Sequence, residues 1–168
     1  MTALMPVRRT PDVTPQSATQ PASARTARIH TILLATDLSP VSDDATRQAI
    51  DLAALLEARL LVVNVIDQLE RVAGRVARID QLRAEREPAL LGVVERARES
   101  GVEAAFLLWT GEPGRSIVAA AAAENADLIV VGTRGHTPVA GLLLGSVTQR
   151  LLHIAPCPIL SVPPRQAT

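Results

Sequence analysis

The chain has 168 residues, and its 17 basic side chains, all of them arginine, balance 17 aspartate and glutamate side chains. A formal charge of zero excludes a nucleic-acid-binding protein that works through bulk basicity. The absence of lysine excludes a phosphate loop of the GxxxxGK[ST] type and any Schiff-base enzyme. Because 48% of the residues are hydrophobic and only 1% are aromatic, we expect a core of Ala, Val, Leu and Ile.

Two compositional features bear on location. Cys157 is the single cysteine, so no intrachain disulfide can form and nothing indicates an oxidising compartment. The sequence has neither the apolar run of a secretory signal nor the roughly 18 apolar residues of a membrane-spanning helix. We therefore expect a cytoplasmic protein that binds no membrane and no nucleic acid.

The two ends of the chain differ in composition from the rest. Residues 1–28 hold four of the 12 prolines among Ser, Thr, Gln and Ala, which predicts a disordered tail. The tail is either a plain solvated extension or a weak electrostatic tether to an anionic partner, because it carries four arginines and one acid. Residues 29–164 are expected to form one domain, followed by a short tail over 165–168.

From His30 onward, short β-rich apolar runs alternate with segments of helical periodicity. Ser42 is expected to cap the first helix, with Asp43 and Asp44 in its first turn. The charged segment 68–99 is expected to be helical, with a restart or kink at Pro88. The remaining expected elements are strands over 31–36, 59–66, 102–109, 127–131 and 158–162, a turn over 111–116, and helices over 117–124 and from Ser146 onward.

This alternation predicts an α/β fold: a single-domain, doubly wound, open sheet of five mainly parallel strands with helices on both faces. Ligands of such Rossmann-like sheets bind beyond the carboxyl ends of the strands, where the strand order reverses. The residues that follow the expected strands are therefore the first candidates for a site, and they are Asp37, Asp67, Thr110 and Gly132.

The most informative segment begins at Gly132, where an apolar strand ends. Gly135 follows three residues later, nine residues intervene, and Gly145 and Ser146 then open a helix, which gives the spacing GxxGx₉GS. The first amides of a helix have no partner within it, so they bind phosphate, and glycine lets the backbone approach closely. The spacing predicts backbone capture of a polyphosphate without lysine. The alternative is that the glycines only shape a connection.

With this motif the chain resembles the universal stress protein family, in particular its nucleotide-binding branch, whose motif is GxxGx₉G[ST]. The resemblance covers residues 28–164. It includes Ile32-Leu-Leu-Ala-Thr-Asp37, Val63-Asn-Val-Ile-Asp67, Gly111-Glu-Pro, Leu144-Gly-Ser-Val-Thr148 and Ala155-Pro-Cys-Pro-Ile-Leu-Ser-Val162. It implies a five-stranded parallel sheet and the binding of ATP with magnesium.

The resemblance also implies roles for individual positions. Asp37 would contact either the adenosine end of the nucleotide or the waters of a magnesium ion. The phosphates would carry this ion, and no protein side chain would bind it directly. The alternative interpretation of Asp37 is a cap of the strand end. The base pocket would be lined by Ala35 and Thr36, with the Val65 backbone meeting adenine. Ribose and phosphates would be held by Gly132, Gly135, Gly145, Ser146, Val147 and Thr148.

Two further polar residues lie inside the glycine loop, and each has two interpretations. Arg134 lies inside the loop and either neutralises phosphate charge or is solvated, and the same holds for His136. The sequence shows no nucleophile paired with a base, and the Ser146 hydroxyl is expected to bind phosphate. ATP hydrolysis is therefore expected to be slow at most, and a nucleotide-responsive stress or signalling regulator describes the chain better than an enzyme.

The last expected strand, Pro158 to Val162, is short and apolar, and we expect it at a sheet edge where a second copy pairs with it in a homodimer. An unknown regulatory protein would read the bound state. The alternative function is a nucleotide-independent interaction or chaperone-like module with an empty glycine loop. Its docking surface would be the 68–99 segment with its five arginines, Arg71, Arg75, Arg78, Arg83 and Arg86.

Overall fold

The computed structural model describes residues 28–67, 71–72, 75–76, 78–133 and 144–164. Its elements follow one another along the chain as β1 (Thr31–Ala35), a 3₁₀ turn (Pro40–Ser42), α1 (Asp43–Leu56), β2 (Arg59–Ile66), β3 (Arg71–Val72), β4 (Arg75–Val76), α2 (Ile79–Glu99), β5 (Ala104–Thr110), α3 (Pro113–Ala123), β6 (Leu128–Gly132), α4 (Ser146–Ile154) and β7 (Ile159–Val162).

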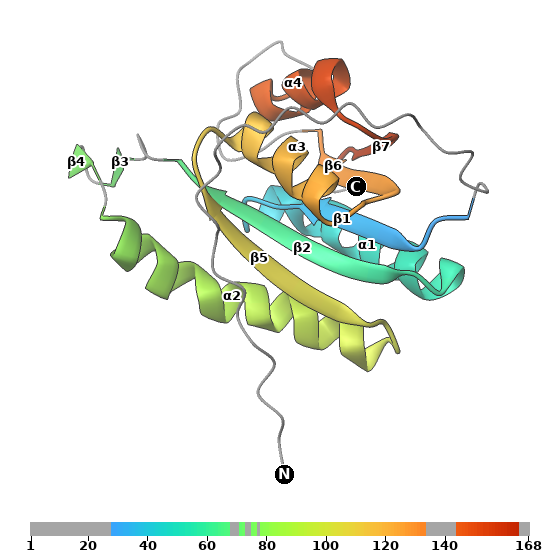
Figure 1. Ribbon diagram of the computed structural model, residues 1–168. Coiled ribbons are helices and arrows are strands. Elements are labelled where there is room, and N and C mark those ends of the chain that lie inside the picture. The colour runs from blue at the N-terminus through green and yellow to red at the C-terminus, as the bar shows by residue number, and fades with distance from the viewer. Residues whose placement is uncertain (1–27, 68–70, 73–74, 77, 134–143, 165–168) are drawn as a thin grey trace.

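Five strands form one parallel sheet in the order β5-β2-β1-β6-β7. Figure 1 shows α1 and α2 on one face of this sheet and α3 and α4 on the other. The predicted α/β fold class is therefore confirmed. The chain leaves β1 toward β2 and β5, then returns on the other side of β1 to β6 and β7, so the strand order reverses between β1 and β6.

Each face of the sheet has its own core because successive side chains of a strand point to opposite faces. On the α1 and α2 face, Ile32, Leu34 and Val62 pack with apolar residues of both helices. On the α3 and α4 face, Leu33 and Ile129 pack with apolar residues of these two helices. The central strand β1 is buried along its whole length, as expected for a parallel sheet covered on both faces.

The segment 68–99 differs from its expected form. Arg71–Val72 and Arg75–Val76 form a two-stranded antiparallel hairpin beside the start of α2, so the helix begins only at Ile79 (Figure 1). The prediction of helix was therefore wrong at Arg71–Val72 and Arg75–Val76. Helical spacing of a few apolar residues is weak evidence over so short a segment, and turn residues can override it.

Of the restart or kink expected at Pro88, the restart was wrong, because α2 is one helix from Ile79 to Glu99 with Pro88 inside it. Pro88 is exposed, whereas Leu82 and Leu90 on either side of it are buried against the sheet. Proline removes one backbone hydrogen bond from the helix. Burial of apolar side chains, at about 1.5–3 kcal/mol for each large one, offsets that loss.

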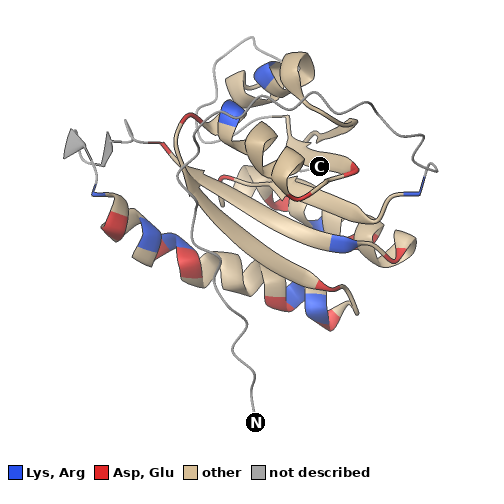
Figure 2. Ribbon diagram, in the orientation of Figure 1, with Lys and Arg blue, Asp and Glu red and all other residues tan. Residues whose placement is uncertain are grey.

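No helix within the described ranges is long and apolar enough to cross a membrane. The charges on α2 are of both signs and alternate along its length, as Figure 2 shows. The five arginines that were expected on one docking helix are therefore divided: Arg71 and Arg75 belong to the hairpin, and α2 presents acids beside its own arginines. The described residues of 68–99 therefore do not form one continuous basic docking helix.

Candidate nucleotide-binding site

The site is the carboxyl edge of the sheet at the reversal point between β1 and β6. Asp37 follows β1 directly after Thr36, and Gly132 is the last residue of β6. Because the strands are parallel, both positions lie at the same edge, next to the start of α4. This is where open α/β sheets bind ligands.

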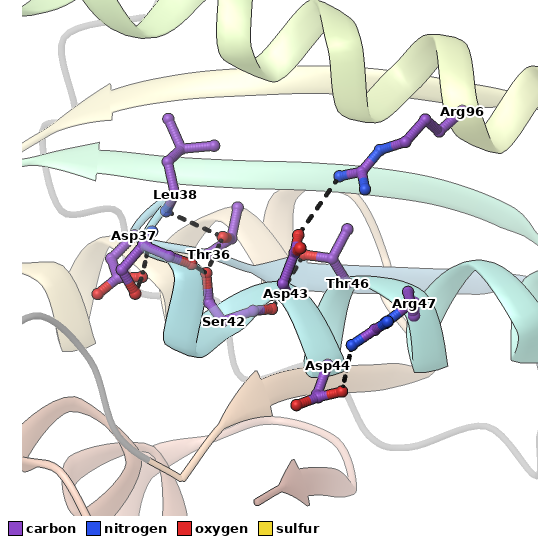
Figure 3. A network of polar contacts seen from close by, with 10 residues as sticks. Thr36, Asp37, Leu38, Ser42, Asp43, Asp44, Thr46, Arg47 and Arg96 are labelled. Carbon is purple, nitrogen blue, oxygen red and sulfur yellow. Dashed lines mark hydrogen bonds and ion pairs between the residues drawn. The ribbon is translucent and has the colours of Figure 1, made fainter. Parts of the chain in front are cut away.

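The chain turns sharply after β1, and hydroxyl groups hold the turn (Figure 3). Thr36 continues the ladder by donating its amide to the Val63 carbonyl over 3.0 Å. Its hydroxyl accepts from the Leu38 amide at 3.0 Å and lies 2.9 Å from the Ser42 hydroxyl. Leu38 has a φ of 62°, a conformation that a non-glycine residue adopts only when its surroundings enforce it. The turn is therefore well determined.

Ser42 precedes α1, as expected, but its side chain makes no capping hydrogen bond to that helix. Its hydroxyl donates to the Ser39 carbonyl at 2.8 Å and bonds with Thr36 instead. The capping role predicted for Ser42 was therefore wrong. The 3₁₀ turn immediately before α1 brings the hydroxyl back toward β1, where it stabilises the turn rather than the helix.

Asp37 also stabilises this turn. Its Oδ1 accepts from the Ser39 amide at 3.0 Å and from the Ser39 hydroxyl at 2.6 Å. The cap interpretation of Asp37 thus describes one of its carboxylate oxygens. The two interpretations are compatible, because a carboxylate has two oxygens and about four sites that accept hydrogen bonds.

The start of α4 is attached to the end of β6 by two hydrogen bonds. The Gly145 amide donates to the Thr133 carbonyl at 2.7 Å, and the Thr148 hydroxyl donates to the Gly132 carbonyl at 2.9 Å. Thr148 is 2% exposed, whereas Ser146 is exposed. The hydroxyl of Thr148 therefore positions the helix, and the hydroxyl of Ser146 is the one presented at the surface.

Three amides at this helix start precede the helical ladder. The first intrahelical bond runs from the Gln149 amide to the Gly145 carbonyl over 2.9 Å, so the amides of Ser146, Val147 and Thr148 have no partner within the helix. No side chain caps α4, and its first turn carries no acid. Such a helix start attracts anions through its dipole and its amides.

The other helices that start at this edge differ from α4. The Glu112 carboxylate caps α3 by accepting from the Gly114 amide at 3.0 Å and from the Arg115 amide at 2.9 Å. α1 has Asp43 and Asp44 in its first turn. Negative charge therefore already occupies both of these helix starts. Among the four α-helices in the described part of the chain, α4 alone has neither a capping side chain nor an acid in its first turn.

The end of β2 brings in two residues that sequence reasoning missed. Asn64 is 3% exposed, and its amide nitrogen donates to the Thr36 carbonyl at 2.8 Å. Arg86, from α2, donates from Nη1 to Asn64 Oδ1 at 2.9 Å and to the Val65 carbonyl at 3.2 Å. An asparagine within an apolar strand was the available signal for Asn64. Arg86 had none, because an arginine on a charged helix is normally solvated.

The structure places most of the predicted site residues, but not all. Ala35 and Thr36 are 5% and 7% exposed, and they face opposite sides of the sheet. Val65, Gly132, Gly145, Ser146, Val147 and Thr148 lie at the carboxyl edge or at the start of α4. Arg134 and Gly135, together with His136, lie outside the described residues.

Comparison with known proteins identifies the family. The model of the universal stress protein family matches residues 28–163. This chain belongs to the universal stress protein family. A universal stress protein of Thermus aquaticus is 40% identical over 142 residues, which cover 79% of this chain and 97% of that protein.

Two solved structures of the family contain nucleotides. A universal stress protein in complex with cAMP is 26% identical, with a TM-score of 0.64 over 80% of this chain and 97% of that one. The universal stress protein of Archaeoglobus fulgidus in complex with dAMP is 25% identical, with a TM-score of 0.60 over 80% and 98% of the two chains. The five-stranded parallel sheet described above is the fold that this chain shares with these two structures. Some relatives therefore bind adenine nucleotides.

Proposed function

We propose that this universal stress protein binds ATP at the carboxyl edge between β1 and β6 and acts as a nucleotide-responsive regulator. The observation that carries the proposal is the start of α4, which is uncapped, free of acids and joined to the end of β6 through Gly132 and Thr133. A polyphosphate supplies the negative charge and the acceptors that such a helix start lacks.

The phosphates would accept from the amides of Ser146, Val147 and Thr148 and from the Ser146 hydroxyl. Gly132 and Gly145 would let the backbone approach them closely. Arg134 and Gly135 belong to the same proposal on the strength of the GxxGx₉GS spacing alone. The base would lie toward β1 and β2, near Ala35, Thr36 and the Val65 backbone, and the cAMP and dAMP complexes of relatives support an adenine nucleotide there.

Magnesium would be carried by the phosphates rather than by a protein site. In the described ranges, no three His, Cys, Asp or Glu side chains lie close enough together to hold a metal ion. Asp37 lies at the carboxyl edge of the sheet, where it would contact waters of a phosphate-bound ion. Its Oδ1 accepts hydrogen bonds from Ser39. When bound, the ion would neutralise phosphate charge. Hydrolysis at such a site would be slow, which suits a regulator.

A second copy of the chain would pair along β7, which is an edge strand of the sheet. The Pro158 carbonyl accepts from Ile129 and the Val162 carbonyl accepts from Thr133, so these residues face β6. Because backbone groups alternate along a strand, those of Ile159 and Ser161 face outward, where a symmetric partner strand can pair with them. Leu152 and Ile154, 56% and 41% exposed on the preceding helix, would add apolar surface to such a dimer.

A competition experiment tests where the phosphates bind. Inorganic tripolyphosphate is expected to displace ATP from the protein at concentrations at which adenosine does not, because the start of α4 would supply most of the binding. ATP that resists tripolyphosphate but yields to adenosine would contradict the phosphate assignment. The Thr148 and Gly145 variants described below then identify the helix start itself.

A further inference from the structure

β2 extends beyond the end of β1, so the backbone groups of Val65 have no strand residue opposite them on that side. Val63 faces β1, since its carbonyl accepts from the Thr36 amide. The backbone groups of Leu60 face β5, because the Leu60 amide donates to the Glu103 carbonyl. Those of Ile66 face the same side, because the Ile66 carbonyl accepts from the Gly111 amide. Backbone groups alternate along a strand, so those of Val65 face the β1 side. The register ends with Ala35 opposite Val63, so no residue of β1 lies opposite Val65.

Arg86 reaches this peptide from α2. Its Nη1 donates to the Val65 carbonyl at 3.2 Å and to Asn64 Oδ1 at 2.9 Å, while the other end of the Asn64 amide donates to the Thr36 carbonyl at 2.8 Å. This chain of hydrogen bonds joins α2 to the ends of β1 and β2. It brings the Arg86 guanidinium to the backbone that would read the base.

We infer that Arg86 determines base specificity and makes the site accept 6-oxo purine nucleotides about as well as 6-amino purine nucleotides. The inference rests on the proposed nucleotide site. A strand-end peptide selects adenine by accepting from its 6-amino group, but the Val65 carbonyl already accepts from a guanidinium. The amino group therefore gains less from this carbonyl than it would from one bonded only to water.

Electrostatics acts in the same direction. A positively charged guanidinium beside the 6-position favours a carbonyl oxygen over an amino group. The hydrogen bond to Asn64 holds the guanidinium in place, so this influence does not depend on a freely rotating side chain. The ligand class is thus a purine nucleoside triphosphate, and the site discriminates little between substituents at position 6 of the base.

The test compares ATP with inosine triphosphate, in which a 6-oxo group and a protonated N1 replace the 6-amino group and the N1 acceptor of ATP. Their dissociation constants are measured by calorimetry, with magnesium, for the intact protein and for Arg86→Met. Arg96→Met is the matched control, because it removes an arginine from the same helix, where Arg96 pairs with Asp43 of α1 at 3.7 Å. Thermal unfolding of each variant shows whether it is folded.

In the intact protein the two dissociation constants are expected to agree within about threefold. Arg86→Met is expected to shift their ratio at least about fivefold toward ATP, through stronger ATP binding, while Arg96→Met leaves the ratio unchanged. A preference of the intact protein for ATP above about tenfold overturns the inference, whether or not the variant folds. So does an unchanged ratio in folded Arg86→Met. Binding of neither nucleotide would instead contradict the proposed function itself.

Discussion

The buried hydroxyl of Thr148 donates a 2.9 Å hydrogen bond to the carbonyl of Gly132, which fixes the start of α4 against the end of β6. Thr148→Val keeps the shape of the side chain and removes the donor, leaving the Gly132 carbonyl without it. We expect a loss of about 1–3 kcal/mol in the free energy of unfolding. Urea denaturation measures this loss, and ATP affinity is expected to fall as the helix start loses its attachment.

Thr46→Val is the matched control for this variant. Thr46 is also 2% exposed, but its hydroxyl donates at 3.1 Å to the Ser42 carbonyl one helical turn earlier. Such a bond within a helix contributes little to stability. If the two variants lose equal stability and bind ATP equally well, Thr148 does not have the positioning role assigned to it.

Gly145→Asp separates ligand binding from folding. Gly145 has a φ of −69° and a ψ of 159°, a conformation that aspartate adopts readily at a helix N-cap. We expect unchanged or slightly higher stability, because the carboxylate accepts from the amides of α4. We also expect loss of ATP binding, because the same carboxylate occupies the place of a phosphate and repels it.

Gly145→Asn has nearly the same size without the charge, and it is expected to retain more of the affinity than Gly145→Asp. Calorimetry measures binding and thermal unfolding measures stability. ATP affinity in Gly145→Asp equal to that of the unaltered protein would exclude the start of α4 as the phosphate site.

Two glycines are expected to respond in opposite directions to substitution by alanine. Gly111 has a φ of 146°, and an added Cβ would lie 2.8 Å from the Ser116 hydroxyl oxygen. Gly111→Ala is therefore expected to lower the free energy of unfolding by about 1–3 kcal/mol. Inside α2, a Cβ added at Gly92 would have no described atom within 4 Å apart from its chain neighbours and the backbone of its own helix, so Gly92→Ala is expected to raise the free energy of unfolding by about 0.5–1 kcal/mol. Chemical denaturation of both variants checks the signs, and a stabilising Gly111→Ala would contradict the conformation described for this turn.

The edge of β7 offers a test of the proposed dimer. The Ser161 amide faces outward, so Ser161→Pro removes a donor from the edge without touching the ladder to β6, and proline is tolerated on such edges. We expect the variant to be a folded monomer in analytical ultracentrifugation. Ser161→Ala is the control and should remain a dimer. It is expected to be at least as stable as the unaltered protein, because the Ser161 hydroxyl is buried with no hydrogen-bond partner in the described part of the chain. A dimer in both variants would contradict pairing through β7.

The sequence predicts the five-stranded sheet and the family well, because parallel strands buried on both faces appear as continuous apolar runs separated by helical segments. It does not predict the β3–β4 hairpin. Val72 and Val76 fit a helical stripe, and a hairpin with strands of two residues has no periodicity to detect. Gly74, between the two strands in sequence, is the one local signal for a turn at this place.

The candidate site is predicted where it depends on local backbone. Gly132, Gly145 and Ser146 follow from the motif, since a strand end and a helix start are local features. Hydroxyl partners are not local: Ser42 bonds to Thr36 instead of capping α1. The role of Arg86 depends on how α2 packs against the end of β2, a tertiary arrangement that the charge pattern of a helix does not encode.

Calorimetric titration with ATP, ADP and AMP, each with and without magnesium, tests the central claim most directly. The protein is first shown by its absorbance ratio to carry no nucleotide from its host. If the phosphates bind at the start of α4, affinity rises with the number of phosphates. Equal affinity for all three nucleotides, or no binding in protein shown to be empty, would contradict the account.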